Sequence, residues 1–488
     1  RRDRKRERRM LDRRQFAGIA AAGGLAALTG RVQAMARSRV PAVHVEAPPA
    51  GAKGRIFGAH AEDLAAQGYV EEEYFVSGTA TSYAPVGALG PDGVWTVAPD
   101  RQAPFRTRVI VQRPADPAAF NGTIICEWAN VSAGFEISSA VNQQFWKDGY
   151  AYAAISAQRM GLEGTKERPL GLRQWDAERY GSLSIAGDSF SYDIFSQVAR
   201  ALGPARGGGG VDPMGGLSVR RLFALGESQS AARLLSYVNA VHRLANVFDT
   251  YMIVVAVGRS TEFDDFVYDP AKSLDENNNI RRSRTVQTRV RTDQRVPVLV
   301  LNSETETPYF FASRQPDSDW YRLWEVAGST HASAIGGGRR PDISARDGVP
   351  DMAARWAKMV DLFPVMEAAA AGLDRWLSGG APLGSFERIA VAGERNAPAT
   401  DGFGNAKGGV RLPEIMVPAA RFVTQTNDAS GRLEPFDAAT LWAIYKDDAD
   451  YAARIRAAAE WAEAAGLILP RRRDEYIAKS ARGPVPFY

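Results

Sequence analysis

Short apolar runs alternate with amphipathic segments along most of this chain. The runs are rich in Val, Ile, Leu and aromatic residues, as in strands that are covered on both faces. Between them, apolar residues recur at helical spacing, for example at 194, 195, 198 and 202. Alternating strands and helices with crossovers predict a mainly parallel sheet with helices on both faces. The predicted strands are 69–76, 107–111, 123–128, 149–156, 222–225, 251–257 and 298–301.

We expect residues 37–488 to form a single α/β domain with several additions. A polar, charged excursion is predicted at 269–295, and a Gly/Arg/Asp-rich stretch predicts a lid loop at about 332–365. Residues 396–488 are interpreted as a C-terminal extension. Helices are predicted at 139–147, 193–202, 366–377 and 447–464, besides the one that follows Ser228.

The N-terminal region differs in charge from the rest of the chain. Residues 1–36 carry +7, so the remainder is −3, although the whole chain is +4. Arg13 and Arg14, followed by Phe16, are typical of a twin-arginine export signal, and the small residues 34 and 36 indicate cleavage after Ala36. This interpretation predicts a bacterial periplasmic or secreted protein. A flexible basic tail with an accidental arginine pair is the alternative.

Composition narrows the possible partners. The apolar content of 45% is that of a globular protein with an ample core. Without its first 36 residues the chain lacks the basic excess that nucleic-acid binding requires. The apolar stretch at 17–29 is too short to span a bilayer, so no stable membrane span is expected after signal removal. The single cysteine, Cys126, cannot form an internal disulfide.

One serine lies where an apolar run gives way to an Ala-rich helix. Residues 222–231 read as a buried strand, an abrupt turn centred on Ser228, and a helix, which is the pattern of a nucleophile elbow. The turn brings the backbone close to itself, so Gly226 and Ser230 must be small. The pattern recurs around Ser189, but the preceding segment is too polar for a buried strand. We therefore predict Ser228 as the nucleophile of a serine hydrolase.

A serine hydroxyl needs a base within hydrogen-bond reach, and the chain contains four histidines. His44 and His60 precede the predicted sheet. His242 lies near the end of the helix that follows Ser228, which carries it away from the serine. His331 follows a short apolar run and a Gly/Ser/Thr loop, and we predict it as the base.

An acid is expected after the penultimate strand, where Glu304 and Glu306 both follow the apolar run at 298–301. Counting along the strand and turn favours Glu306 as the partner of the histidine, with Glu304 as the second choice. The chain order Ser228, Glu306, His331 is that of α/β-hydrolases and differs from the orders in chymotrypsin and subtilisin.

A tetrahedral intermediate also needs two N–H donors for its oxyanion. The residue after the nucleophile, Gln229, supplies one at the start of a helix. The other is expected in the loop at 129–134, from the backbone of Asn130 or Val131. Such a site requires no metal or organic cofactor.

These residues resemble the α/β-hydrolase superfamily, and more closely a bacterial family described as an alpha/beta-hydrolase domain. The resemblance implies an α/β-hydrolase fold and a Ser/acid/His hydrolase with its acid at Glu306, but it implies no substrate. It rests on the segments 127–132, 156–158, 187–195, 226–231, 303–306, 325–331 and 404–413.

Several positions near the predicted site keep two interpretations. Trp128 lines an apolar substrate pocket or packs in the core. Arg411, within 404–413, faces a substrate anion or forms a structural salt bridge. The segment 187–195 borders the pocket or turns the chain into a helix.

The sequence thus predicts an exported carboxylic-ester hydrolase that acts on a small-molecule ester through an acyl-enzyme. Acyl transfer by the same residues, or ligand binding without catalysis on a hydrolase scaffold, are the alternatives.

Overall fold

The computed structural model describes residues 39–138, 144–165, 168–266, 272–331, 340–350, 359–424 and 430–486. The export signal predicted at 1–36 lies outside them. So do residues 332–339 and 351–358 of the predicted lid loop, whereas 340–350 and 359–365 are described.

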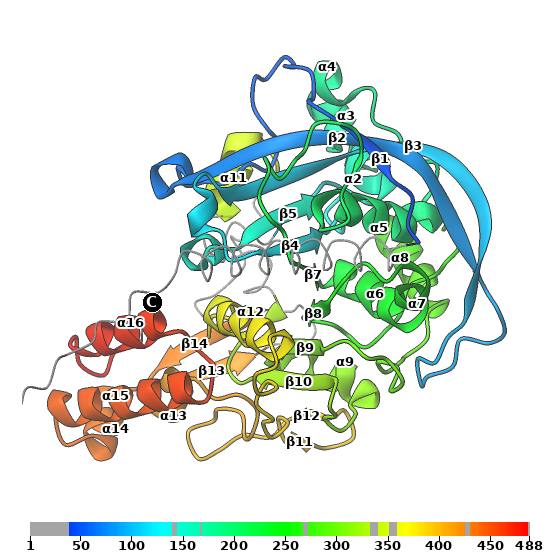
Figure 1. Cartoon of the computed structure of the whole chain (residues 1–488). Helices are drawn as coiled ribbons and strands as arrows, with labels where there is room; N and C mark the ends of the chain where they lie inside the picture. Colours follow the sequence, from blue (N-terminus) through cyan, green and yellow to red (C-terminus); the bar gives the residue numbers. More distant parts are fainter. Residues whose placement is uncertain are drawn as a thin grey trace, which may run out of the picture.

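A ten-stranded sheet forms the centre of the molecule, with the strand order β10-β9-β8-β7-β4-β5-β3-β2-β1-β6 (Figure 1). Strands β5, β4, β7, β8, β9 and β10 are parallel, as predicted. The strands are β1 Val43–Glu46, β2 Tyr69–Pro85, β3 Val97–Pro114, β4 Thr123–Trp128, β5 Ala151–Ile155, β6 Gly208–Gly210, β7 Arg221–Glu227, β8 Thr250–Val254, β9 Val298–Ser303 and β10 Tyr321–Val326.

Side chains of the parallel strands alternate between two cores, one on each face of the sheet. Ile124 and Ala224 belong to the core under α5 and α6, whereas Ile125 and Phe223 belong to the core under α12. This alternation explains the continuous apolar runs, because both faces of each strand are covered. The helices concerned are α5 Ser191–Leu202, α6 Gln229–Ser236 and α12 Phe363–Leu377.

Strands β2 and β3 form a much longer antiparallel hairpin than the predicted strands 69–76 and 107–111. Figure 1 shows the two strands as a long curved pair that extends well beyond the neighbouring strands. Pro99 and Pro104 lie within β3 and pair with β2. Proline and charged residues concealed this part of the strand from sequence reasoning, since proline is confined to positions where a missing N–H is tolerated.

The remaining elements are additions to the sheet and its covering helices. The charged excursion at 269–295 contains α8. Of the helix predicted at 139–147, residues 139–143 lie outside the described residues, and a 3₁₀ turn spans Phe145–Asp148. Within the described part of the chain, no helix is both long and apolar enough to cross a membrane. The additional helices are α2 Arg159–Glu163, α3 Leu172–Trp175, α4 Ala177–Tyr180, α7 His242–Ala245, α8 Leu274–Ser283, α9 Thr307–Phe310 and α11 Arg340–Asp347.

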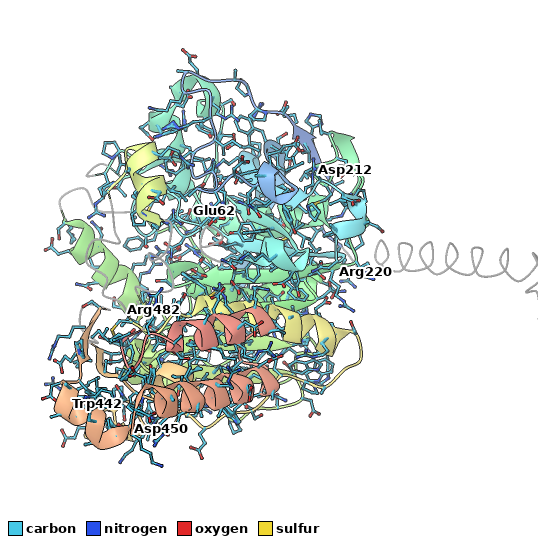
Figure 2. All side chains as sticks on the ribbon, turned by 90° about the vertical axis from the view of Figure 1, so that its left-hand side faces the viewer. Glu62, Asp212, Arg220, Trp442, Asp450 and Arg482 are labelled. Carbon is cyan, nitrogen blue, oxygen red and sulfur yellow. The ribbon has the colours of Figure 1, made fainter. Side chains whose placement is uncertain are left out.

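The C-terminal region packs on the α12 side of the sheet. Arg471 and Arg472 both donate to the buried carboxylate of Glu367 on α12, each at 2.8 Å. Figure 2 shows Trp442 and Asp450 at the outer end of this region. Its elements are β11 Val391–Ala392, β12 Ala397–Pro398, α13 Pro413–Met416, β13 Ala420–Thr424, β14 Gly431–Pro435, α14 Ala438–Ile444, α15 Asp448–Ala464 and α16 Pro470–Ser480.

Candidate active site

Ser228 stands at the sharp turn between β7 and α6. It has φ 58° and ψ −111°, a conformation that costs energy for a residue with a side chain. A Cβ added at Gly226 would lie 2.7 Å from the carbonyl oxygen of Ser230, so only glycine fits there. The strand, strained serine and helix are the geometry of a nucleophile elbow.

Ser230 takes the second small position of the elbow, where glycine is usual. Its hydroxyl accepts from the Glu227 N–H and donates to the Glu227 carbonyl, both at 2.9 Å. The side chain is fully buried. Serine therefore fits the narrow turn and also ties the first turn of α6 back to the end of β7.

His331 reaches Ser228 from the loop after β10. Its Nε2 lies 2.7 Å from the Ser228 Oγ. The His331 backbone N–H donates to the Thr305 hydroxyl at 2.8 Å, which fixes the imidazole-bearing residue to the loop after β9. The ring is thus placed to accept the serine proton.

Glu306 lies on the other side of the imidazole, in the 3₁₀ turn after β9. Its Oε1 is 2.8 Å from the His331 Nδ1. Its Oε2 accepts from the Ser303 N–H at 2.9 Å and from the Ser303 hydroxyl at 2.5 Å, while the Thr305 hydroxyl donates to Oε1. These bonds fix both oxygens of the carboxylate, so Glu306 orients the imidazole.

Glu304, the second-choice acid, points elsewhere. It accepts from the Gly328 N–H at 2.6 Å and from the Thr424 hydroxyl at 2.8 Å. Burial raises the pKa of its carboxyl to about 6. Glu304 therefore joins the histidine loop to β13 of the C-terminal region and does not bind His331.

The backbone around the serine offers two candidate donors to an oxyanion. The N–H of Gln229 lies at the start of α6, where the first N–H groups have no partner within the helix. The N–H of Val131, in the loop after β4, makes only a long 3.5 Å bond to the Gln229 Oε1. Of the two alternatives predicted in this loop, Asn130 and Val131, Asn130 is excluded, because its N–H is bonded to the Ile137 carbonyl at 2.9 Å.

Asn130 nevertheless holds the two halves of the site together. Its side-chain NH₂ donates to the Glu227 carbonyl at 2.9 Å, directly before the serine. Its Oδ1 accepts from both the N–H and the hydroxyl of Ser132. The loop after β4 is therefore bound to the elbow through the side chain of Asn130, whereas the sequence prediction concerned its backbone N–H as an oxyanion donor.

The family model for an alpha/beta hydrolase domain matches residues 45–478. The chain belongs to this alpha/beta hydrolase family. The match covers the sheet, the elbow and most of the C-terminal region, so these parts form one family unit. Among curated proteins, none shows a significant match to the chain.

Solved structures of other α/β-hydrolases are only distantly similar. The esterase Est22 is 10% identical with a TM-score of 0.29, over 64% of this chain and 81% of that chain. The glucuronoyl esterase from Solibacter usitatus is 10% identical with a TM-score of 0.25, over 60% and 86% of the two chains. The serine hydrolase XC6422 from Xanthomonas campestris is 11% identical with a TM-score of 0.28, over 55% and 96%.

The two side chains considered as substrate contacts, Trp128 and Arg411, are bound to other residues within this α/β-hydrolase. Trp128 is fully buried, and its ring lies 4.7 Å from that of Phe195. The Arg411 guanidinium donates to Asp401 at 2.8 Å and to the Ala406 and Ile415 carbonyls. Both side chains serve packing and internal pairing, so neither enters the proposal below.

The competing serine and histidine candidates lie in other surroundings. Ser189 is buried, and its hydroxyl donates to Asp265 at 3.1 Å. His242 pairs with the Tyr251 hydroxyl, and burial lowers its pKa to about 4. In the described chain, no group of three or more His, Cys, Asp or Glu residues could hold a metal ion.

Sequence reasoning missed the polar side chains beside the elbow. Gln158 bonds to Trp128, Gln229 and Asp188, and so links three segments that carried the family resemblance. The segment 187–195 therefore contributes Asp188 to this network. A signal was present, since Gln158 and Asp188 both lie within those segments, but nothing in the sequence paired them.

Proposed function

We propose that this α/β-hydrolase is a serine carboxylic-ester hydrolase with the triad Ser228, His331 and Glu306. One observation carries the proposal: a strained elbow serine, an imidazole and a carboxylate are joined in series at 2.7 and 2.8 Å. That series supplies a nucleophile, a base and the group that orients the base.

Acylation begins when the Ser228 Oγ attacks the ester carbonyl carbon while His331 Nε2 takes its proton. The carbonyl oxygen becomes an oxyanion that accepts from the N–H groups of Gln229 and Val131. Glu306 stabilises the imidazolium through the Nδ1–H. The C–O bond to the alcohol then breaks, His331 gives its proton to the leaving oxygen, and an acyl-enzyme remains.

Deacylation repeats these steps with water. His331 takes a proton from water, the hydroxyl adds to the acyl carbon, and the proton returns to the Ser228 Oγ as the carboxylic acid leaves. An alcohol or amine in place of water would give acyl transfer through the same steps. The two outcomes differ only in the acceptor that enters the site.

Hydrolysis of p-nitrophenyl acetate, butyrate and octanoate by the purified protein tests the proposal. We expect turnover that falls at least about a thousandfold in Ser228→Ala, because the acyl-enzyme cannot form. Ser189→Ala, at the competing motif, is the matched control and should retain activity. Equal hydrolysis by wild type and Ser228→Ala would overturn the proposal, and faster ester exchange with added butanol would favour acyl transfer.

We further propose that the protein is exported through the twin-arginine route. The paired Arg13 and Arg14 with Phe16 support this, together with the small residues around a cleavage site after Ala36. Replacing both arginines by lysine should leave the uncleaved chain in the cytoplasm. Unchanged periplasmic activity and cleavage in that variant would contradict export by this route.

A further inference from the structure

A chain of amide hydrogen bonds runs from the protein core to the candidate oxyanion site. Gln158 is 1% exposed, and its Oε1 accepts from the Trp128 indole N–H at 3.0 Å and from the Gln229 Nε2 at 2.9 Å. The Gln158 Nε2 donates to Asp188 at 3.0 Å. The chain ends where the Gln229 Oε1 accepts the Val131 N–H at 3.5 Å.

The direction of these bonds is fixed by groups that cannot reverse their roles. An indole N–H only donates and an ionised carboxylate only accepts, so Gln158 must turn its oxygen to Trp128 and its NH₂ to Asp188. Gln229 must then turn its NH₂ to the Gln158 oxygen. Its own oxygen is left facing the Val131 N–H.

Asp188 is itself held in place. It accepts from the Arg159 N–H at 2.9 Å and lies 3.3 Å from the guanidinium of Arg233, a fully buried arginine. The second carboxylate near Arg233 is Glu262, at 3.7 Å. Both Asp188 oxygens accept hydrogen bonds in these contacts, which fixes the orientation of the amide chain.

We propose that the side-chain amide of Gln229 is a cap on the oxyanion site, which the substrate carbonyl oxygen must displace. This rests on the proposed function, in which Val131 donates to the oxyanion. Val131 is 3% exposed, so an uncapped N–H would be costly, and Gln229 satisfies it in the free enzyme.

The geometry of the cap allows the exchange. At 3.5 Å its bond to Val131 is long and weak, whereas an N–H bond to an oxyanion is short and charge-assisted. The Gln229 oxygen cannot remain beside the oxyanion, because two acceptors would compete for one hydrogen. Gln229 is partly exposed, so its side chain can turn toward solvent.

Removing the cap should therefore help the oxyanion to enter. We expect Gln229→Ala to raise kcat/KM for p-nitrophenyl acetate by a few-fold, up to about tenfold, the value of one net hydrogen bond. The inhibition constant of phenylboronic acid, whose tetrahedral serine adduct places a hydroxyl in the oxyanion site, should fall by a similar factor. Gln229→Met, which keeps the chain length without the amide, should act in the same direction.

Gln294→Ala is the matched control. Gln294 is more buried than Gln229, but like Gln229 it accepts a backbone N–H, here from Val296, and donates to a carbonyl. It precedes β9, whereas the candidate site follows the ends of β4, β7 and β9. This variant should leave both constants unchanged.

A lower kcat/KM or weaker boronate binding in folded Gln229→Ala and Gln229→Met would overturn the proposal. An unchanged kcat/KM and an unchanged inhibition constant would overturn it too, because the Gln229 amide would then not oppose binding of the oxyanion. Failure of the proposed function looks different: phenylboronic acid would not inhibit wild type, or hydrolysis would persist in Ser228→Ala.

Discussion

Replacing Glu306 by glutamine tests how the carboxylate acts on the imidazole. The Ser303 N–H can only donate and lies 2.9 Å from the Glu306 Oε2, so the oxygen of the new amide must take that position. The amide NH₂ then takes the place of the present Oε1, which lies 2.8 Å from the His331 Nδ1. His331 would have to accept at Nδ1 and carry its proton on Nε2, where it cannot receive the proton of Ser228.

The size of the effect follows from this wrong tautomer. In serine proteases the corresponding carboxylate-to-amide change lowers kcat by about 10⁴, or about 5 kcal/mol in the barrier. We expect a loss of about 10³ to 10⁴ in kcat for p-nitrophenyl acetate from Glu306→Gln. The free energy of unfolding should change little, because the Ser303 N–H remains bonded.

Glu304→Gln is the matched comparison for this experiment. It lies two residues away and contacts Gly328 and Thr424, not His331. Its kcat should stay within a few-fold of wild type. The reasoning fails if Glu304→Gln loses as much activity as Glu306→Gln, or if Glu306→Gln stays active at pH 7.

Three further changes give distinct outcomes. Because burial raises the folded pKa of Glu304 to about 6, its ionisation destabilises the fold as pH rises from about 4.5 to 6. Glu304→Gln should therefore add up to about 2 kcal/mol to the free energy of unfolding at pH 8 but not at pH 4. An equal effect at both pH values would refute this. Burial lowers the folded pKa of His242 to about 4, so stability is lost as pH falls below about 6.5. In urea titrations at pH 5, His242→Gln should remove about 2 kcal/mol of that loss. If the free energy of unfolding falls with pH as steeply in the variant as in wild type, the imidazole is not the cause. Gly226→Ala should cost about 1 to 3 kcal/mol in thermal unfolding, since its Cβ meets the Ser230 carbonyl at 2.7 Å, and wild-type stability would mean that the elbow can open.

The parallel part of the sheet could be predicted because burial on both faces leaves a continuous apolar run in the sequence. The β2–β3 hairpin could not be predicted at its full length, because backbone pairing and not apolar pattern holds the segment around Pro99 and Pro104 in the strand. Helix boundaries were close where capping residues mark them: Asp447, at the predicted start of 447–464, caps α15 by accepting the Asp450 N–H.

The candidate site was predictable where chain order and turn chemistry constrain it. Because the chain has only four histidines, His331 could be chosen by elimination, and the structure brings it together with Ser228 and Glu306. The choice between Asn130 and Val131 as the second oxyanion donor could not be made from the sequence, since the pairing of the Asn130 N–H with Ile137 depends on how the loop after β4 folds back.

The most direct test of the central claim is the site of a covalent label. The protein is treated with a fluorophosphonate, and the adduct is located by mass spectrometry of its peptides. We predict one adduct, on Ser228, that is lost in Ser228→Ala and kept in Ser189→Ala. Labelling that persists in Ser228→Ala, or no labelling of the active wild-type protein, would contradict the serine mechanism.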